Sequence, residues 1–229
     1  VSEIEKGLNK TVTLSTGEKI ETRSIIIATG ANWRELGVPG ERENIGNGVA
    51  YCPHCDGPFF KGKDVAVVGG GNSGIEAAID LSTLASKVTV FEFLPELKAD
   101  KILIDQAFEK ENIDIHTNVE VQEIIAGNQQ VKAIKYKNRE SENESSLNIS
   151  GVFVQIGLIP NSQFLKGVVE LNNFGEIIVN DYGETSEEGI FACGDVTTVP
   201  YKQIIISMGE GAKASLAASD YLMKQPAIS

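Results

Sequence analysis

Hydrophobic and polar positions alternate along the first residues of the chain and then give way to an unbroken apolar run. Segments 11–14 and 19–22 flank the turn-forming stretch 15–18, a pattern typical of a β-hairpin. The run 25–28 has no polar alternation and ends at Thr29-Gly30, which favours a strand buried on both faces of a parallel sheet. No earlier strand–helix units precede this run, so we expect the sequence to open in the middle of a domain.

The middle of the chain has a repeated strand–helix order. Apolar runs at 65–68, 88–91 and 113–115 predict three strands, and the stretches 72–85 and 99–111 predict the helices between them. A βαβαβ order of this kind is typical of a doubly wound α/β fold with a parallel sheet.

An inserted antiparallel meander is expected after the third of these strands. Segments 119–125 and 131–137 predict two strands, and the polar tip 139–146 predicts a solvated loop. The apolar run 151–157 then closes the unit.

The rest of the chain predicts strands at 176–179 and 189–192 and a helix over 209–223. Segment 40–50 is rich in Gly, Glu and Asn and predicts a connection. We therefore expect three segments: part of one domain at 1–46, a whole domain at 47–156, and the first domain resumed at 157–229.

Composition narrows the class of protein. The net charge of −12 argues against a nucleic-acid or anionic-membrane partner, because both need clustered Lys and Arg. No run of about 18 apolar residues predicts a membrane span. The first residues have neither the basic nor the apolar region of a signal peptide, and three cysteines are too few for a secreted disulfide framework. These features favour a soluble cytoplasmic protein.

A GxGxxG motif joins the predicted strand 65–68 to the predicted helix that follows it. In this context the first glycine permits a tight turn, the second lets the backbone approach a pyrophosphate, and the third lets helix and strand pack closely. The helix N-terminus adds free N–H groups and partial positive charge. A plain strand-to-helix turn is the competing interpretation. The residues are Gly69, Gly70, Gly71, Asn72, Ser73 and Gly74.

Glu92 ends the second strand of this unit, about twenty residues after the glycine turn, where an acidic side chain can bind the adenosine ribose hydroxyls. The segment 93–97 that follows contains no arginine. A 2′-phosphate would therefore meet a carboxylate and no guanidinium, which predicts a preference for NADH over NADPH. An exposed acid at a strand end is the alternative.

Cys52 and Cys55 are separated by two residues, a spacing that allows a small disulfide ring and a dithiol–disulfide cycle. His54 could raise the thiolate fraction, and Asp56 is in position to exchange the proton that thiolate chemistry requires. Zinc is an alternative, but a closed structural site needs four ligands, and no second CxxC or HxxxH is present. The remaining candidates, Cys193 and His116, lie far away in the sequence. Inert buried thiols are a further alternative.

Two short motifs flank the middle unit. Thr29-Gly30 and Gly194-Asp195 each follow a buried apolar strand, one before and one after the predicted nucleotide-binding domain. Either alone could be an ordinary turn. Together they suggest a split domain that binds a second nucleotide.

These motifs resemble the low-molecular-weight thioredoxin reductase family, in which a nicotinamide-nucleotide domain is inserted into a discontinuous FAD domain. The resemblance rests on 27–30, on a CxxC-Asp-Gly sequence before the glycine turn, and on 191–195. Within that family it extends to the flavoprotein components of bacterial alkyl hydroperoxide reductases through 52–58, 154–161 and 201–206, and it covers essentially the whole chain.

The resemblance implies an NADH-dependent flavoprotein. NADH at the glycine turn would reduce FAD, and FAD would reduce the Cys52–Cys55 disulfide, with Cys55 as the thiol nearest the flavin. Cys52 would then attack the disulfide of a partner, with Asp56 as acid and base. The partners implied are a thioredoxin-like N-terminal module and a peroxiredoxin, and the assembly implied is a homodimer. The residues implied for FAD are Thr29, Gly30, Thr185, Gly194, Asp195, Lys202 and Gln203.

Two parts of the family pattern do not occur in these 229 residues: the N-terminal FAD fingerprint and the thioredoxin-like modules. We therefore expect an N-terminally truncated chain with an incomplete FAD domain that retains FAD weakly. Two other functions stay open at this point. One is an NADPH-dependent thioredoxin reductase, and the other is a nucleotide-binding module without turnover.

Overall fold

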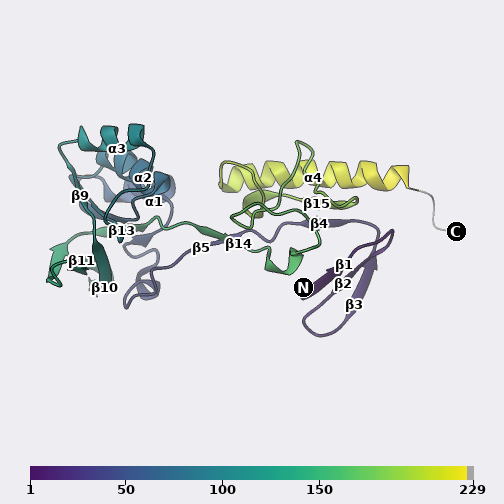
Figure 1. The fold of residues 1–229 in the computed structure, drawn as a ribbon, viewed down its shortest axis with the longest axis horizontal. Helices are drawn as coiled ribbons and strands as arrows, with labels where there is room; N and C mark the ends of the chain where they lie inside the picture. The colour runs from purple at the N-terminus through teal and green to yellow at the C-terminus, as the bar shows by residue number, and fades with distance from the viewer. Residues whose placement is uncertain (226–229) are drawn as a thin grey trace. The chain divides into compact units, whose positions relative to one another are not determined.

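The computed structural model describes residues 1–225 and divides the chain into two compact units. One is the middle unit, residues 33–157, and the other is the split unit, which combines residues 1–32 with 158–229. Figure 1 shows the elements of both along the chain. The architecture is the α/β fold with a parallel sheet core that the strand–helix order predicts.

A five-stranded parallel sheet forms the core of the middle unit. Its strands are hydrogen-bonded in the order β6-β13-β7-β8-β9. This confirms the predicted βαβαβ unit and the strand within 151–157 that closes it. It adds one strand, residues 49–50, at the end of the segment expected to be a connection. The strands are β6 (Val49–Ala50), β13 (Gly151–Val154), β7 (Asp64–Val68), β8 (Lys87–Phe91) and β9 (Ile113–His116).

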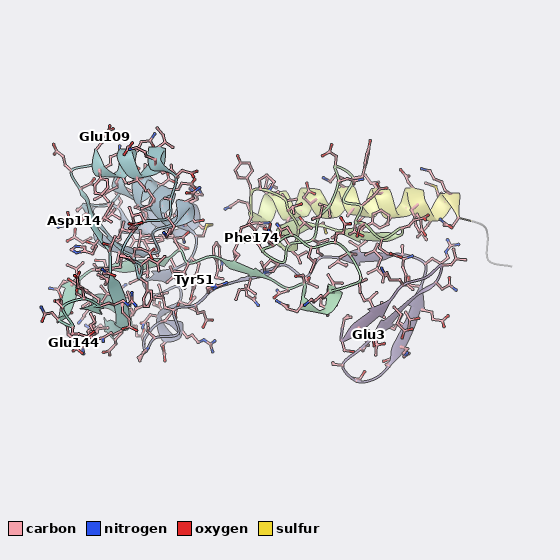
Figure 2. The ribbon with its side chains drawn as sticks, viewed as in Figure 1. Glu3, Tyr51, Glu109, Asp114, Glu144 and Phe174 are labelled. Atoms are coloured by element: carbon pink, nitrogen blue, oxygen red, sulfur yellow. A yellow bond between two sulfur atoms is a disulfide. The ribbon has the colours of Figure 1, made fainter. Side chains whose placement is uncertain are left out.

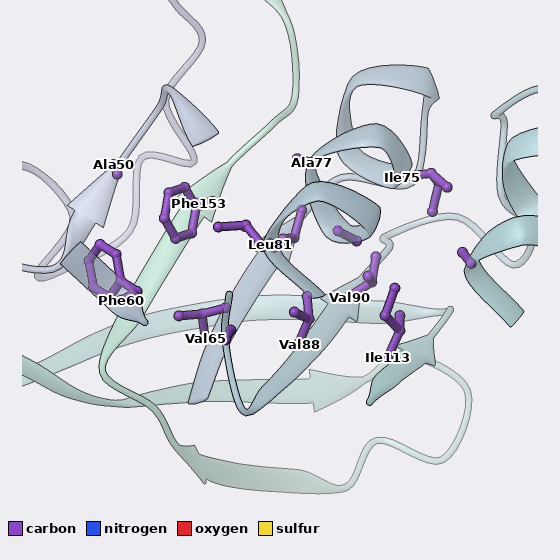
Figure 3. Packing of buried hydrophobic residues seen from close by; sticks show 14 residues of the cluster. Ala50, Phe60, Val65, Ile75, Ala77, Leu81, Val88, Val90, Ile113 and Phe153 are labelled. Atoms are coloured by element: carbon purple, nitrogen blue, oxygen red, sulfur yellow. The ribbon is translucent and has the colours of Figure 1, made fainter. Parts of the chain in front are cut away.

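Side chains of these strands alternate between two hydrophobic layers because successive residues of a strand point to opposite faces. Val65 and Val67 pack with α2 (Asn72–Ser82) and α3 (Lys101–Phe108) in the layer drawn in Figure 3. Ala66 belongs to the other layer, against the meander. The sheet is buried on both sides, as its continuous apolar runs predict.

The meander has three strands, where the sequence predicts two. They are β10 (Val119–Gly127), β11 (Gln130–Asn138) and β12 (Glu144–Asn148), paired antiparallel in that order. The prediction of a solvated loop over 139–146 is therefore wrong beyond residue 143. β12 is an edge strand with mostly exposed side chains, so backbone hydrogen bonds to β11 maintain it without an apolar signal in its sequence.

The main elements of the split unit are an antiparallel sheet, a pair of parallel strands and one long helix. The hairpin of β2 (Lys10–Thr13) and β3 (Lys19–Thr22) forms as predicted and is extended by β1 (Glu3–Glu5). β4 (Ile25–Ile27) pairs in parallel with β15 (Ile190–Ala192).

Three predictions for this unit need correction. Ile26 of β4 is 41% exposed, so β4 is not buried on both faces; among residues 1–225 its only strand neighbour is β15. Residues 176–179 form no strand, because only Ile177 makes bridges, to Leu171 and Thr197. The last helix, α4 (Ile204–Lys224), begins five residues before Gly209, because Gln203 in extended conformation is its N-cap.

Residues 33–46 belong to the middle unit, whereas the sequence analysis put the first boundary after residue 46. The reason is the fully buried carboxylate of Glu41, which accepts hydrogen bonds from the N–H groups of Leu36 (2.9 Å) and Gly37 (2.7 Å). It also accepts one from the Tyr51 hydroxyl (3.0 Å). The two passages between the units run through the paired strands β5 (Ala31–Trp33) and β14 (Leu158–Pro160). None of the helices within residues 1–225 has the length and apolar character needed to cross a bilayer.

Candidate active site

Cys52 and Cys55 are joined in a disulfide at the start of the short helix α1 (Pro53–Asp56). Cys52 is the N-cap and Pro53 occupies the first turn, where its missing N–H and fixed φ are favourable. The Cys55 N–H donates to the Cys52 sulfur at 3.2 Å. Cys55 is exposed and Cys52 half-buried, so the disulfide is open to solvent on the Cys55 side.

The residue before the dithiol is fixed by its neighbours. Tyr51, labelled in Figure 2, stacks on Trp33 with ring centroids 6.0 Å apart. Burial raises the pKa of its hydroxyl, and the hydrogen bond to Glu41 raises it further. Gln155 donates to the Tyr51 carbonyl at 2.8 Å. These contacts fix the backbone that leads into Cys52.

The helix that carries the dithiol packs on α2. Gly57, which follows Asp56 and begins the 3-10 helix η2 (Gly57–Phe60), lies so close to Leu81 of α2 that an added Cβ would be 3.2 Å from its Cδ2. His54 Nδ1 lies 3.4 Å from the Asp80 carboxylate, also on α2. α2 begins at the glycine turn, so the dithiol and the glycine turn are parts of one packed unit.

Asp56 is the half-buried acid of this segment. Burial raises the pKa of its carboxyl above the ordinary value, and a hydrogen bond with the Cys52 backbone partly offsets this. A carboxyl that keeps its proton to higher pH can donate it to a nearby thiolate.

The glycine turn, residues 69–74, has the backbone geometry that the motif predicts. Gly69 has φ +123°, a conformation that side-chain-bearing residues rarely adopt, and its N–H donates to the Phe91 carbonyl at 2.9 Å. A Cβ at Gly74 would collide with the Gly69 carbonyl oxygen. At Gly71 a Cβ would meet no atom within 4 Å, so the backbone there is open to a ligand. Glycine is thus required at each of these three positions for a different steric reason.

Glu92 closes the other side of this turn. The residue is 8% exposed, and its carboxylate accepts hydrogen bonds from the N–H groups of Gly70 and Leu94, the latter at 2.8 Å. The sequence predicts an acidic residue at this strand end, but it does not predict the hydrogen bond from Gly70 to its carboxylate. A carboxylate can accept four hydrogen bonds, so lone pairs remain for ribose hydroxyls.

Asn72 and Asp100 connect the starts of the two helices. The Asp100 N–H donates to Asn72 Oδ1 at 2.7 Å, and Asn72 Nδ2 donates to the Asp100 carboxylate at 3.0 Å. The side chain of Asn72 therefore orients the start of α3, while the backbone of the turn stays available. Ser73 follows it in the first turn of α2 and is exposed.

In the split unit, the two flanking motifs meet at one sheet edge. Thr29-Gly30 follows β4 and Gly194-Asp195 follows β15, and these strands are parallel neighbours. Gly30 has φ +67° and open space at its Cβ position, and Asp195 accepts a hydrogen bond from the Ser207 hydroxyl of α4 at 3.1 Å. Backbone and side-chain polar groups therefore converge there.

The other residues implied for FAD already take part in interactions within the split unit. The Thr185 hydroxyl donates to the Ile190 carbonyl at 2.8 Å. Lys202 Nζ pairs with Glu176 at 3.0 Å and also donates to the Thr197 carbonyl, so its ammonium is already partnered. Gln203 is the N-cap of α4.

Cys193, the third cysteine, is a free thiol of the split unit. It is buried against α4 in a cluster with Phe191, Ala214 and Ala218. Burial raises the pKa of its thiol, which disfavours the reactive thiolate. Its role is therefore packing.

Arg139 is the residue that sequence reasoning missed. Its guanidinium carbon lies 3.7 Å from the ring centroid of Phe93, the residue after Glu92. No local signal places residue 139 beside residue 93, because the contact depends on how the meander folds back. Within residues 1–225, no cluster of three or more His, Cys, Asp or Glu side chains is arranged to hold a metal ion.

Comparison with known proteins identifies the family. The family model described as pyridine nucleotide-disulphide oxidoreductase matches residues 1–212, nearly the whole chain. The chain belongs to this family.

Among relatives, the F subunit of the Pseudomonas putida alkyl hydroperoxide reductase is 52% identical over 223 residues, which cover 97% of this chain and 43% of that protein. A Bacillus subtilis protein named NADH dehydrogenase is 54% identical over 211 residues, covering 92% of this chain and 41% of that one. The chain thus spans less than half the length of these curated relatives.

Solved structures of thioredoxin reductases share the fold. The enzyme from Streptococcus pyogenes has a TM-score of 0.92 and 38% identity, with 98% of this chain and 74% of that chain covered. The enzyme from Giardia duodenalis also has a TM-score of 0.92, at 30% identity, with 97% and 74% covered.

Proposed function

We propose that this chain carries the dithiol and nucleotide-binding parts of an NADH-dependent flavoprotein disulfide reductase. Electrons pass from NADH through FAD to the Cys52–Cys55 disulfide and on to a thioredoxin-like module and a peroxiredoxin, in peroxide detoxification. The observation that carries this proposal is the packing of the disulfide helix α1 on α2, the helix that begins at the glycine turn.

The middle unit binds the nicotinamide nucleotide in this proposal. Gly71 leaves room for the pyrophosphate at the start of α2, where backbone N–H groups and the helix dipole favour an anion. Glu92 accepts hydrogen bonds from the ribose hydroxyls. The segment after Glu92 contributes no arginine of its own, which supports NADH as the preferred donor.

The split unit contributes the FAD site. The fit rests on two parallel strands that both end in left-handed glycines, Gly30 at φ +67° and Gly194 at φ +73°, with Asp195 beside the second. Such glycines let a ligand approach the backbone closely. When bound, FAD supplies the two-electron carrier between a hydride donor and a disulfide.

The dithiol performs the remaining chemistry. Two electrons and two protons convert the Cys52–Cys55 disulfide into two thiols, and Asp56, with its raised pKa, holds and returns one of those protons. The Cys52 thiolate then attacks the partner's disulfide and forms a mixed disulfide, releasing the partner's first sulfur as a thiolate. Cys55 resolves the mixed disulfide, which restores the Cys52–Cys55 bond and leaves the partner with two thiols. A reducing compartment such as the cytoplasm suits a cycling pair of this kind.

The similarity to the F subunits of alkyl hydroperoxide reductases supports a role in hydroperoxide reduction. We propose a peroxiredoxin as the final acceptor and a homodimer as the assembly. The test is steady-state turnover of the FAD-bound protein with NADH and a disulfide acceptor. We expect Cys52→Ser and Cys55→Ser to abolish acceptor reduction and Cys193→Ala, which removes the third thiol, to retain it. Full activity in Cys52→Ser and Cys55→Ser would refute the assignment.

A second candidate is an NADPH-dependent thioredoxin reductase, favoured by the thioredoxin reductases that share this fold. The two candidates differ in donor. A kcat/KM for NADPH above that for NADH would favour the second candidate, and the reverse would favour the first.

A further inference from the structure

Arg139 lies against the segment where the second strand of the nucleotide-binding unit ends. Its planar guanidinium stacks on the Phe93 ring, 3.7 Å from the centroid, and its Nη1 donates to the Phe93 carbonyl at 2.9 Å. Phe93 is half exposed, and Arg139 is exposed. The positive charge of Arg139 thus lies against Phe93, the residue after Glu92, although segment 93–97 itself contains no cationic residue.

The position of Arg139 is fixed by backbone bonds on both sides. The Arg139 N–H donates to the Asn118 carbonyl at 2.7 Å, and the Asn118 N–H donates to the Leu94 carbonyl at 2.9 Å. The Val119 N–H donates to the Glu92 carbonyl at 2.9 Å. The meander is therefore joined to the residues that flank Phe93, and the backbone of Arg139 is fixed beside this segment.

The guanidinium of Arg139 donates to a backbone carbonyl. Other cations of the same meander, such as Lys135 and Lys137, pair with acidic residues, whereas Arg139 forms no ion pair among residues 1–225. One of its five N–H donors is used by the Phe93 carbonyl, which leaves the others for an anion. The carboxylate of Glu92, in contrast, belongs to a buried residue and already accepts hydrogen bonds from two backbone N–H groups.

We propose that Arg139 is a nucleotide-binding residue that sets how strongly this site discriminates against a 2′-phosphate. In a βαβ dinucleotide site, the acid that ends the second strand faces the ribose 2′-oxygen, and a phosphate on that oxygen extends toward the residues that follow the acid. Glu92 repels such a phosphate, and Arg139 offsets the repulsion with a charge-assisted hydrogen bond. The site therefore prefers NADH and binds NADPH more weakly, without excluding it. This inference rests on the proposed nucleotide site.

Binding of two adenosine fragments tests the inference without redox turnover. We would measure calorimetric binding of 5′-AMP and of 2′,5′-ADP, which differ by the 2′-phosphate alone, to the wild-type protein and to Arg139→Ala. Arg139→Ala should weaken 2′,5′-ADP binding by about tenfold, the size of one charge-assisted hydrogen bond, and change 5′-AMP binding by less than about twofold. Arg139→Lys, which keeps the charge without the planar fork, should lie between them.

Lys135→Ala is the matched control, because it removes one positive charge from the same meander at a side chain paired with Glu144 at 2.9 Å. It should leave binding of both fragments unchanged. Retained 5′-AMP binding also shows that each variant is folded. Equal weakening of both fragments, no weakening of either, or wild-type binding of 5′-AMP alone would overturn the role of Arg139. Failure of the wild type to bind either fragment would overturn the proposed nucleotide site as well.

Discussion

The carboxylate of Glu92 accepts a hydrogen bond from the backbone N–H of Gly70, a residue of the glycine turn. The same carboxylate accepts the Leu94 N–H at 2.8 Å, so it joins the turn to the segment that follows β8. In this arrangement the buried acid holds the shape of the turn through both of its carboxylate oxygens. A substitution at Glu92 should therefore affect the stability of the turn and the binding of the nucleotide together.

Glu92→Gln should destabilise the middle unit and weaken nucleotide binding together. The amide has one acceptor oxygen, so one of the two backbone donors faces an NH2 group and loses its partner, at a cost of about 1–3 kcal/mol. Denaturant unfolding measures this loss. Glu96→Gln, whose carboxylate is exposed in the same segment, is the control and should change stability by less than about 0.5 kcal/mol. Equal stability of Glu92→Gln and wild type would contradict the observed bonds.

The glycines of the turn should differ in what their substitution costs. Gly74→Ala places a Cβ against the Gly69 carbonyl and should destabilise the protein by about 1–3 kcal/mol or more. Gly71→Ala meets no atom and has φ −83°, so stability should stay within about 0.5 kcal/mol of wild type. Its methyl group should nevertheless lower NADH affinity about tenfold, because it occupies the space left for the pyrophosphate. Unchanged NADH affinity in a folded Gly71→Ala protein would place the nucleotide elsewhere.

Asp56→Asn should change the dependence of stability on pH. Folding raises the pKa of Asp56 through burial, so the native state binds this proton more tightly than the unfolded state does. The contribution of Asp56 to stability is therefore greatest below its unfolded pKa and decreases as the pH rises through the folded pKa. The variant should match or exceed the wild type in unfolding free energy at neutral pH, and this advantage should disappear in acid.

Urea titrations of both proteins at several pH values would measure this difference. The account would be contradicted if Asp56→Asn were less stable than the wild type at neutral pH and equally stable in acid. That result would mean that the native state favours the ionised carboxylate of Asp56. Reduction of the acceptor should also slow in Asp56→Asn, because the amide cannot exchange a proton with the dithiol.

The elements that the sequence predicts correctly are those whose signal is local. The runs at 65–68 and 88–91 are apolar with little interruption because both faces of β7 and β8 are covered, one by helices and one by the meander. The glycine turn is predictable for a related reason, since each required glycine leaves a steric signature in the sequence itself.

The features that the sequence does not reveal depend on partners distant in the chain. β12 has a polar sequence and exists through its pairing with β11. The boundary at residue 33 depends on the hydrogen bonds of Glu41. Glu41 is fully buried, which the sequence does not suggest because a charged side chain is usually exposed. Arg139 reaches Phe93 across 46 positions, so the absence of arginine from segment 93–97 does not describe the charge that lies against this segment.

Counting thiols after anaerobic reduction tests the central claim most directly. The FAD-bound protein would be reduced with one equivalent of NADH, alkylated, and mapped by mass spectrometry. We predict that two thiols appear together, at Cys52 and Cys55, while Cys193 carries the same label before and after reduction under unfolding conditions. Oxidation of NADH with the Cys52–Cys55 bond intact would contradict the account.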